Sequence, residues 1–145
     1  MKVLALGGSG GMGRYAVQYL HNIKQIEKIY VADVNSLSAK KFASQFDNRV
    51  EGLKLDIRDF ETLKSEMSKV DIVVNTTGPF FLFAEPILKA AIQTNTHYFD
   101  ICDDWEPTEK MLQMNEDAKK ANITAIIGLG ACLLYTSDAA DEPSS

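Results

Sequence analysis

Short apolar runs and amphipathic stretches alternate along the chain of 145 residues. Apolar runs of about 4–8 residues, bounded by polar residues or glycine, are typical of buried strands. Stretches in which apolar residues recur every three or four positions are typical of helices that pack one face against a core. The pattern predicts strands at 3–6, 28–33, 50–55, 71–75, 97–101 and 123–127, and helices at 16–23, 37–46 and 60–67.

Two prolines indicate where the remaining helices begin. Pro86 precedes apolar residues at Leu88 and Ala91, and Pro107 opens a stretch that continues to about Ala121. Proline suits the first turn of a helix because its φ is already fixed and its missing N–H would have no partner there. We therefore expect one helix to begin at Pro86 and another at Pro107.

Six short strands that alternate with helices predict an α/β fold. Such a pattern favours a parallel sheet that is covered on both faces, and right-handed crossovers favour a doubly wound arrangement. We expect a single domain with a Rossmann-type doubly wound parallel sheet. Ligands of such folds bind outside the carboxyl ends of the strands, so the residues that follow each strand are the candidates for chemistry.

Composition and charge exclude several classes of protein. The formal net charge is −5, whereas proteins that bind nucleic acid usually carry clustered Lys and Arg. The sequence holds neither a span of about 18 apolar residues nor a signal-peptide core, so we expect no membrane segment. Cys102 and Cys132 lack the spacing of a zinc site or a disulfide framework. We expect no metal, and a cytoplasmic protein.

A glycine-rich segment provides the most informative motif. Gly8, Ser9, Gly10, Gly11, Met12 and Gly13 match G-x-G-x-x-G between the first strand and the first helix. We expect Gly8 to take the tight turn, Gly10 to let a pyrophosphate approach, and Gly13 to let helix and strand pack closely. Amides 11–13, at the positive end of the helix, would bind the phosphates. The alternative is a turn that binds nothing.

Asp33 supplies the second half of this motif. It ends the second strand, twenty residues after Gly13, the spacing at which a carboxylate accepts hydrogen bonds from the adenosine ribose. Because a carboxylate repels a 2′-phosphate, Asp33 favours NAD over NADP. Lys40 and Lys41, in the next helix, leave NADP open, and the alternative role of Asp33 is that of a helix N-cap or a turn residue.

Further candidates follow the third and fourth strands. Asp56 is a candidate acceptor for the adenine amino group, with capping of the next helix as an equal alternative. Residues Thr76, Thr77, Gly78, Pro79 and Phe80 follow the fourth strand, next to the topological switch point. We expect this segment near the nicotinamide and its ribose, with an ordinary loop as the alternative.

Acidic residues gather after the fifth strand. Alternation along that strand sends His97 and Ile101 to one face and Tyr98 and Asp100 to the other, which argues against a metal site. We expect the acids in 100–104 to cap the Pro107 helix or to face a cationic group of a substrate. Asp100 and Asp103 are the candidate catalytic residues, without an assigned acid or base role.

These motifs together resemble the NAD(P)-binding domain of saccharopine dehydrogenase-like proteins. The family includes lysine and saccharopine deaminases, and the resemblance covers residues 1–131. The matching segments are MKVLALGGSGGMG, VADVN, DIVVNTTGPF, HYFDICDDWEPTEKM and ANITAIIGLGA. The resemblance implies that the glycine loop holds the pyrophosphate, that Asp33 binds the ribose, that 77–80 approach the nicotinamide, and that 100–104 line the active-site cleft.

The family usually continues into a domain that binds the substrate and forms a dimer. The resemblance therefore implies the cofactor domain of an NAD(P)-dependent oxidoreductase that acts on C–N bonds of amino-acid-derived substrates, with its substrate domain missing. Such a segment would bind cofactor with little turnover. The segment 132–145, CLLYTSDAADEPSS, resembles translated sequencing-adaptor read-through. We expect a non-native or disordered tail there.

Two rival functions differ in class from this interpretation. A complete short-chain dehydrogenase would need a Tyr-x-x-x-Lys pair, and no tyrosine of this chain has lysine four positions later. A non-catalytic sensor or regulator would use the same fold to bind the dinucleotide and a partner protein. Since a fold does not determine a function, this second rival stays open.

Overall fold

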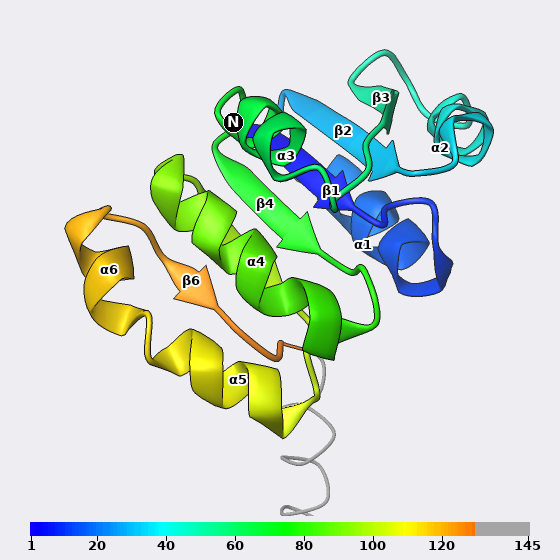
Figure 1. Cartoon of the computed structure of the whole chain (residues 1–145). Coiled ribbons are helices and arrows are strands. Elements are labelled where there is room, and N and C mark those ends of the chain that lie inside the picture. The colour runs from blue at the N-terminus through cyan, green and yellow to red at the C-terminus, as the bar shows by residue number, and fades with distance from the viewer. Residues whose placement is uncertain (130–145) are drawn as a thin grey trace, which may run out of the picture.

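The computed structural model describes residues 1–129 and places six parallel strands in one sheet (Figure 1). The strands lie in the order β3-β2-β1-β4-β5-β6. They are β1 (Lys2–Leu6), β2 (Lys28–Asp33), β3 (Val50–Lys54), β4 (Ile72–Asn75), β5 (His97–Asp100) and β6 (Ala125–Ile126). This arrangement confirms the α/β, Rossmann-type doubly wound sheet. The expected domain end at 131 and the tail 132–145 lie outside the described residues.

Helices cover the two faces of the sheet. On one face, α1 (Gly11–His21) and α2 (Ser36–Ala43) enclose a core with the side chains of Val3 and Ala5. On the other face, α3 (Phe60–Met67), α4 (Phe80–Gln93) and α5 (Trp105–Leu112) enclose a core with Leu4 and Leu6 (Figure 1). Successive β1 residues therefore belong to opposite cores, as the period of two in a strand requires.

The central position of β1 explains why its residues 3–6 are all apolar and buried. It pairs with β2 on one side, Leu4 opposite Tyr30, and with β4 on the other, Leu4 opposite Val73. A strand that is covered on both faces and paired on both edges has no position for a polar side chain. The chain leaves β1 toward α1 on one face and leaves β4 toward α4 on the other, because the order of the strands reverses between them.

The fourth helix begins earlier than the sequence pattern predicts. α4 starts at Phe80 and contains Pro86 in its interior, so the expected start at Pro86 was wrong. Phe80 and Ala84 pack against the core cluster of this face, and their burial favours the additional turns. Leu82, whose carbonyl would normally accept the missing N–H of residue 86, is exposed, as is Pro86. Exposure limits the cost of the lost hydrogen bond.

The last helical stretch and the last strand are shorter than predicted. The helix expected from Pro107 to Ala121 is divided at Gln113 and Met114 into α5 and α6 (Asn115–Lys120), and α5 begins two residues before Pro107. Neither glycine nor proline marks the division. Among residues 1–129, β6 pairs with β5 alone, and the strand comprises two of the five residues expected in it.

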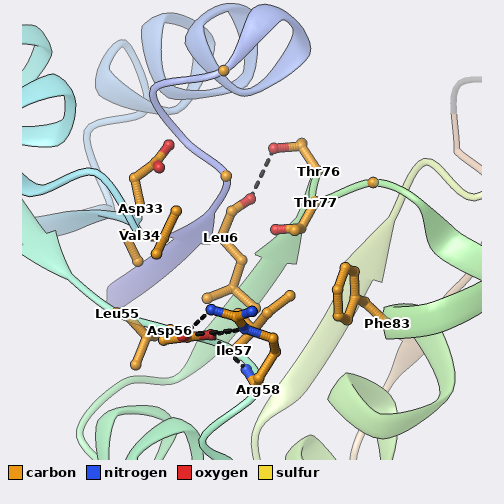
Figure 2. A pocket seen from close by; sticks show the side chains of 14 residues that line it. Leu6, Asp33, Val34, Leu55, Asp56, Ile57, Arg58, Thr76, Thr77 and Phe83 are labelled. Atoms are coloured by element: carbon orange, nitrogen blue, oxygen red, sulfur yellow. Dashed lines mark hydrogen bonds and ion pairs between the residues drawn. The ribbon is translucent and has the colours of Figure 1, made fainter.

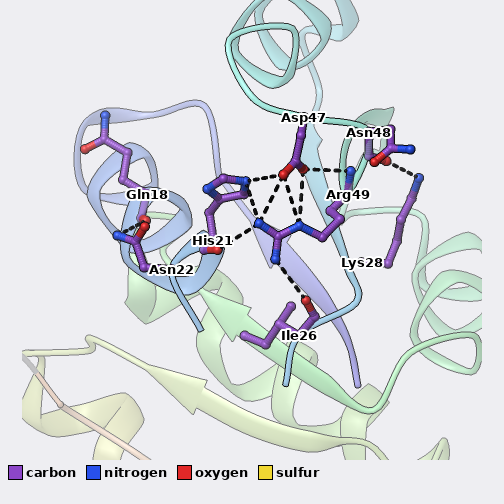
Figure 3. A network of polar contacts seen from close by, with 8 residues as sticks. All are labelled: Gln18, His21, Asn22, Ile26, Lys28, Asp47, Asn48 and Arg49. Carbon is purple, nitrogen blue, oxygen red and sulfur yellow. Dashed lines mark hydrogen bonds and ion pairs between the residues drawn. The ribbon is translucent and has the colours of Figure 1, made fainter. Parts of the chain in front are cut away.

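A polar cluster joins the end of α1 to the loop before β3 (Figure 3). His21 Nε2 lies 3.0 Å from Asp47 Oδ2, and Arg49 Nη2 lies 3.1 Å from the same oxygen. Arg49 also donates to the carbonyl oxygen of Ile26, at 3.4 Å. The cluster thereby links three segments at the amino-terminal side of β2 and β3, the side opposite the carboxyl ends of the strands.

No helix within residues 1–129 is both long and apolar enough to cross a bilayer.

Candidate functional site

A cavity of about 480 Å³ lies at the carboxyl ends of the first four strands. Figure 2 shows Asp33 on one side of this cavity and Thr76 and Thr77 on the other, with Leu6 between them. Its lining comprises Leu6, Gly7, Gly10, Ala32, Asp33, Val34, Leu55, Asp56, Ile57, Arg58, Thr76, Thr77, Gly78 and Phe83. The cavity occupies the place at which doubly wound folds bind ligands.

The turn after β1 differs in one detail from the prediction. Gly7, not Gly8, takes the left-handed conformation, with φ of +69°. A Cβ on Gly8 would instead lie 2.9 Å from the carbonyl oxygen of Ala5 and 3.1 Å from Val31. Gly8 is therefore required for close packing on the ends of β1 and β2, whereas Gly7 supplies the turn.

Gly13 lets α1 approach the loop that follows β1, whereas the sequence predicted a close approach of the helix to the strand itself. A Cβ at Gly13 would lie 2.1 Å from the Gly7 carbonyl oxygen, so no larger residue fits without a shift of the backbone. The amides of Gly11, Met12 and Gly13 donate no hydrogen bond to another backbone group within residues 1–129. These three N–H groups are thus free to receive an anion at the positive end of the helix.

Asp33 is fixed by hydrogen bonds from two neighbouring segments. Ser9 Oγ donates to its Oδ2 at 2.5 Å, and the Asn35 amide donates to its Oδ1 at 3.1 Å. The N-cap of α2 is Asn35, which accepts from the Ser38 amide, so Asp33 is not the helix cap. A half-buried carboxylate therefore lines the cavity in a defined orientation beside the glycine loop.

Asp56 and Arg58 form an ion pair on the wall of the cavity (Figure 2). Arg58 Nη2 lies 2.7 Å from Asp56 Oδ2, and these side-chain hydrogen bonds lower the pKa of Asp56 to about 2. The alternative role of Asp56 as a helix cap was wrong, because Asp59 caps α3 by accepting from the Thr62 amide. Asp56 is too far before the helix for its side chain to take that position.

The segment after β4 presents two threonines with different surroundings. Thr76 Oγ1 donates to the carbonyl oxygen of Leu6 at 2.8 Å, which ties β4 to β1. Thr77 Oγ1 is buried and has no hydrogen-bond partner among the described residues. A buried hydroxyl without a partner costs free energy, and the residue that carries this one also lines the cavity.

Part of the predicted segment turns away from the cavity. Gly78 lines it, but Pro79 is the N-cap residue of α4 and Phe80 packs against the core. Phe83, one turn later, lines the cavity instead. This change follows from the early start of α4, which turns the chain at Pro79.

Asp100 is a buried structural residue. It is 1% exposed, and its carboxylate accepts hydrogen bonds from the Tyr98 hydroxyl at 2.6 Å and from the Cys102 and Gly128 amides. The expectation that it faces a substrate or caps a helix was therefore wrong. Tyr98 and Asp100 do share one face of β5, as predicted, and burial raises the pKa of Tyr98 well above its ordinary value.

The side chains of Asp103 and Asp104, the other acids of this loop, do not cap a helix either. Asp104 stands at the N-cap position of α5, but its side chain makes no capping hydrogen bond, and its carbonyl oxygen accepts from Thr108 instead. Asp103 is exposed. Neither residue lines the cavity, so the structure brings the nucleotide candidates together and leaves the two catalytic candidates outside them.

Sequence reasoning missed Arg58 and Phe83 as lining residues. The sequence could have indicated Arg58 as a lining residue, because it stands two residues after Asp56, beyond the end of a strand. It could not have indicated Phe83, since the position of Phe83 depends on where α4 begins. The assembled site offers free amides for an anion, a fixed carboxylate for a diol, and a buried hydroxyl for a polar group at the far side.

The chain is similar to known proteins over most of its length. A family model described as the saccharopine dehydrogenase NADP binding domain matches residues 3–126. A lipid droplet localized protein of Caenorhabditis elegans is 29% identical over 140 residues, which are 90% of this chain and 32% of that protein. The chain thus spans about a third of the length of this relative.

Solved structures show the same fold. Saccharopine dehydrogenase (L-Glu forming) from Saccharomyces cerevisiae superposes with a TM-score of 0.74 at 22% identity, over 89% of this chain and 27% of that one. Triphenylmethane reductase of Citrobacter sp. in complex with NADP(H) gives a TM-score of 0.64 at 18% identity, over 88% and 48%. At these identities the likeness is one of fold.

Proposed function

Because this chain belongs to the family of the saccharopine dehydrogenase NADP binding domain, we propose that its cavity binds a nicotinamide dinucleotide in an extended form across β2, β1 and β4. One observation carries the proposal: Gly7 and Gly10, of the loop that leads into the free amides of Gly11–Gly13, line the same cavity as the Asp33 carboxylate and Thr77, whose hydroxyl is unpartnered among the described residues. A pyrophosphate at the amides would direct the adenosine toward Asp33 and the nicotinamide toward Thr77.

The proposed preference is for NAD over NADP. The Asp33 carboxylate is already oriented by Ser9 and Asn35, so it can accept from ribose hydroxyls without losing side-chain freedom. The same charge opposes a 2′-phosphate. Asp56, held by Arg58 on the neighbouring wall, is our candidate acceptor for the adenine amino group, since each carboxylate oxygen can accept more than one hydrogen bond.

The proposed parent protein is an oxidoreductase of the saccharopine dehydrogenase type that acts on C–N bonds of amino-acid-derived substrates. The bound nicotinamide supplies the hydride chemistry, and this chain's residues bind and orient it. Asp100 is buried in hydrogen bonds and Asp103 is exposed away from the cavity. We therefore assign the proton-transferring groups and the substrate contacts to other parts of the parent, together with any dimer surface.

The placement of Asp100 and Asp103 also favours a second candidate function. A dinucleotide sensor or regulator needs the binding cavity alone, without acid or base groups beside the nicotinamide. The two functions share their ligand and differ in turnover. A full-length relative that oxidises or reduces an amino-acid-derived substrate would support the enzyme, whereas cofactor binding without turnover, with affinity changed by a partner protein, would support the sensor.

Titration with NADH tests the shared claim. Trp105 is the one tryptophan in the sequence and is 77% exposed at the start of α5, so its emission reports energy transfer to bound NADH. We expect saturable quenching of tryptophan emission, reversed by ADP because ADP occupies the adenosine half of the cavity.

The variant Gly10→Ala is the matched control. A Cβ at Gly10 would meet only the Gly7 carbonyl oxygen, at 3.2 Å, so the fold can accommodate it, but Gly10 lines the cavity at the place where the motif brings the pyrophosphate against the backbone. The variant should keep its unfolding transition and lose most of the fluorescence response. Absence of a response in the unmodified protein at millimolar NADH, or an equal response from Gly10→Ala, would contradict the proposal.

A further inference from the structure

Arg58 presents a flat guanidinium to the cavity in a fixed orientation. Its Nε donates to Asp56 Oδ1 at 2.9 Å and its Nη2 donates to Oδ2 at 2.7 Å, so two nitrogens of one plane bind one carboxylate. Such a two-point contact restricts rotation of the guanidinium. The Arg58 side chain is nevertheless 71% exposed, and both residues line the cavity. The plane of the guanidinium is therefore accessible to a ligand.

The ends of β2 and β3 bring apolar side chains beside this ion pair. The Leu55 amide donates to the Asp33 carbonyl oxygen at 3.0 Å, so the residues that follow the two strands lie next to each other. Val34, Leu55 and Ile57 line the same cavity as the ion pair (Figure 2). An apolar wall beside a planar cation suits a flat aromatic ring, because such rings stack on guanidinium planes.

Asp56 retains a small, defined capacity to accept hydrogen bonds. Three N–H groups of Arg58, which are its backbone amide, Nε and Nη2, already donate to the carboxylate. Since a carboxylate has about four acceptor sites, roughly one is left for a ligand. The hydrogen bonds from Arg58 lower the pKa of Asp56 to about 2, so at neutral pH the remaining site accepts and cannot donate. The ion pair thus combines one free acceptor with a stacking plane, and its two charges offset each other.

We propose that Arg58 selects the base of the dinucleotide, by stacking on the ring and by fixing Asp56 as the acceptor for a 6-amino group. This inference rests on the proposed dinucleotide function and deepens it by assigning base selection to Arg58. The 6-amino group of adenine has two N–H donors, and one of them can use the remaining acceptor site of Asp56. A 6-oxo purine presents a carbonyl oxygen at the same place, which the carboxylate repels.

Isothermal titration with ADP and IDP tests this selection without the nicotinamide half. The two probes share the ribose and the diphosphate and differ in the 6-amino or 6-oxo edge of the purine. In the unmodified protein we expect ADP to bind about tenfold more tightly than IDP, the size of one hydrogen bond to a charged group. Asp56→Asn should bring the two affinities within about twofold of each other, because its amide can donate to the carbonyl oxygen of IDP.

Variants of Arg58 separate the guanidinium plane from its charge. Arg58→Ala should weaken ADP binding by about fivefold, the size of an exposed stacking contact, and reduce the preference for ADP because Asp56 is then free to rotate. Arg58→Lys keeps the charge but loses the plane and the two-point contact, so it should behave like Arg58→Ala. Lys24→Gln, at an exposed position before β2, is the matched control and should change neither affinity. Because Arg58 is exposed, its variants should keep the unfolding transition of the unmodified protein.

The outcomes distinguish this inference from the proposed function. If neither ADP nor NADH binds the unmodified protein, the dinucleotide function fails and base selection fails with it. If NADH binds but ADP and IDP bind equally, or if Arg58→Lys keeps the affinity and the preference of the unmodified protein, the function stands and the role of Arg58 is wrong. A preference for ADP that both Arg58 variants diminish supports the inference.

Discussion

In the proposed function, Asp33 is the residue on which the choice between NAD and NADP depends most directly. Its carboxylate lines the cavity and is held by Ser9 and Asn35, so its charge faces the ribose position in a fixed orientation. We predict that Asp33→Ser shifts the ratio of NAD(H) to NADP(H) affinities toward NADP(H) by about 1–2 kcal/mol, because a charged contact becomes neutral. Parallel calorimetric titrations with the two cofactors measure this ratio.

The control for Asp33 is Asp71→Ser. Asp71 is exposed at the amino end of β4, where it accepts a hydrogen bond from the Lys2 amide, so its loss removes a charge far from the cavity. The affinity ratio of this variant should equal that of the unmodified protein. An unchanged ratio in Asp33→Ser would mean that Asp33 only organises the loop.

Gly11 and Gly13 are two residues apart, and their substitutions should differ in effect on stability. Gly13→Ala places a methyl group against the backbone at Gly7 and Gly8, so we predict a loss of about 1–3 kcal/mol in the free energy of unfolding. Gly11→Ala fills open space in the first turn and should leave that free energy unchanged or raise it by up to about 1 kcal/mol. Urea denaturation followed by circular dichroism compares the two, and equal losses would refute the packing argument.

At the scale of elements, a buried hydrogen-bonded group joins β4, β5 and the chain after β6. Asn75 Nδ2 donates to the Tyr98 hydroxyl, which in turn donates to Asp100, and Asp100 accepts from the Gly128 amide. These contacts cross three neighbouring segments of the sheet. The Tyr98 hydroxyl is at their centre.

We predict that Tyr98→Phe lowers the free energy of unfolding by about 1–3 kcal/mol, because Asp100 and Asn75 would each lose a partner in a buried position. Tyr30→Phe is the control, since Tyr30 packs against the same core without a hydrogen bond from its hydroxyl among the described residues. Chemical denaturation of both variants measures their free energies of unfolding. A loss in Tyr98→Phe no larger than in Tyr30→Phe would show that these hydrogen bonds do not stabilise the sheet.

Local sequence signals predicted most elements and several of the residues that line the cavity. The glycine loop, Asp33 and the ends of β1 to β4 follow from spacing and apolar runs, which are local properties. The start of α4 did not follow from such local properties, because burial of Phe80 and Ala84 outweighs the local preference of Pro86 for the first turn of a helix. Tertiary packing had the larger effect there.

The sequence could not indicate which acidic side chains would accept hydrogen bonds from other residues of the chain. Asp100 lies in an acidic segment that resembles a cleft lining, but its donors come from Tyr98 on its own strand and Gly128 after β6. The contacts of Arg14 with Ser9 and Phe42 likewise join residues that only the fold brings together. These hydrogen bonds and contacts join residues that are far apart in the sequence, or they depend on the direction of a side chain. The hydrophobic periodicity of the sequence therefore cannot predict them.

At the scale of the whole molecule, acid sensitivity should come from carboxylates paired with arginine. The hydrogen bonds from Arg49 and Arg58 lower the pKa values of Asp47 and Asp56 from 3.8 to about 2. A lowered pKa in the folded state means that the unfolded chain binds the proton more tightly. The stabilisation is therefore present in full above about pH 5 and is lost as the pH falls toward 2.

We predict that the free energy of unfolding decreases across this acidic range, and that Asp47→Asn makes the decrease shallower. Asp47 is exposed, so the effect will be small and best seen as a change of slope in denaturation midpoints measured at successive pH values. Asp103→Asn is the control, because Asp103 is exposed and makes no ion pair among the described residues. Identical slopes for the unmodified protein and Asp47→Asn would contradict the contribution assigned to the cluster in Figure 3.

The central claim is that one cavity, at the carboxyl ends of β1 to β4, binds the dinucleotide. Amide chemical shifts in a ¹⁵N-labelled sample, followed during titration with NADH, test it most directly because they report on each residue separately. We predict progressive, saturable shifts for the amides of Gly11–Gly13, Asp33 and Thr77, and none at the amino ends of the strands. Shifts that are absent at millimolar NADH, or that gather on another face of the molecule, would contradict the claim.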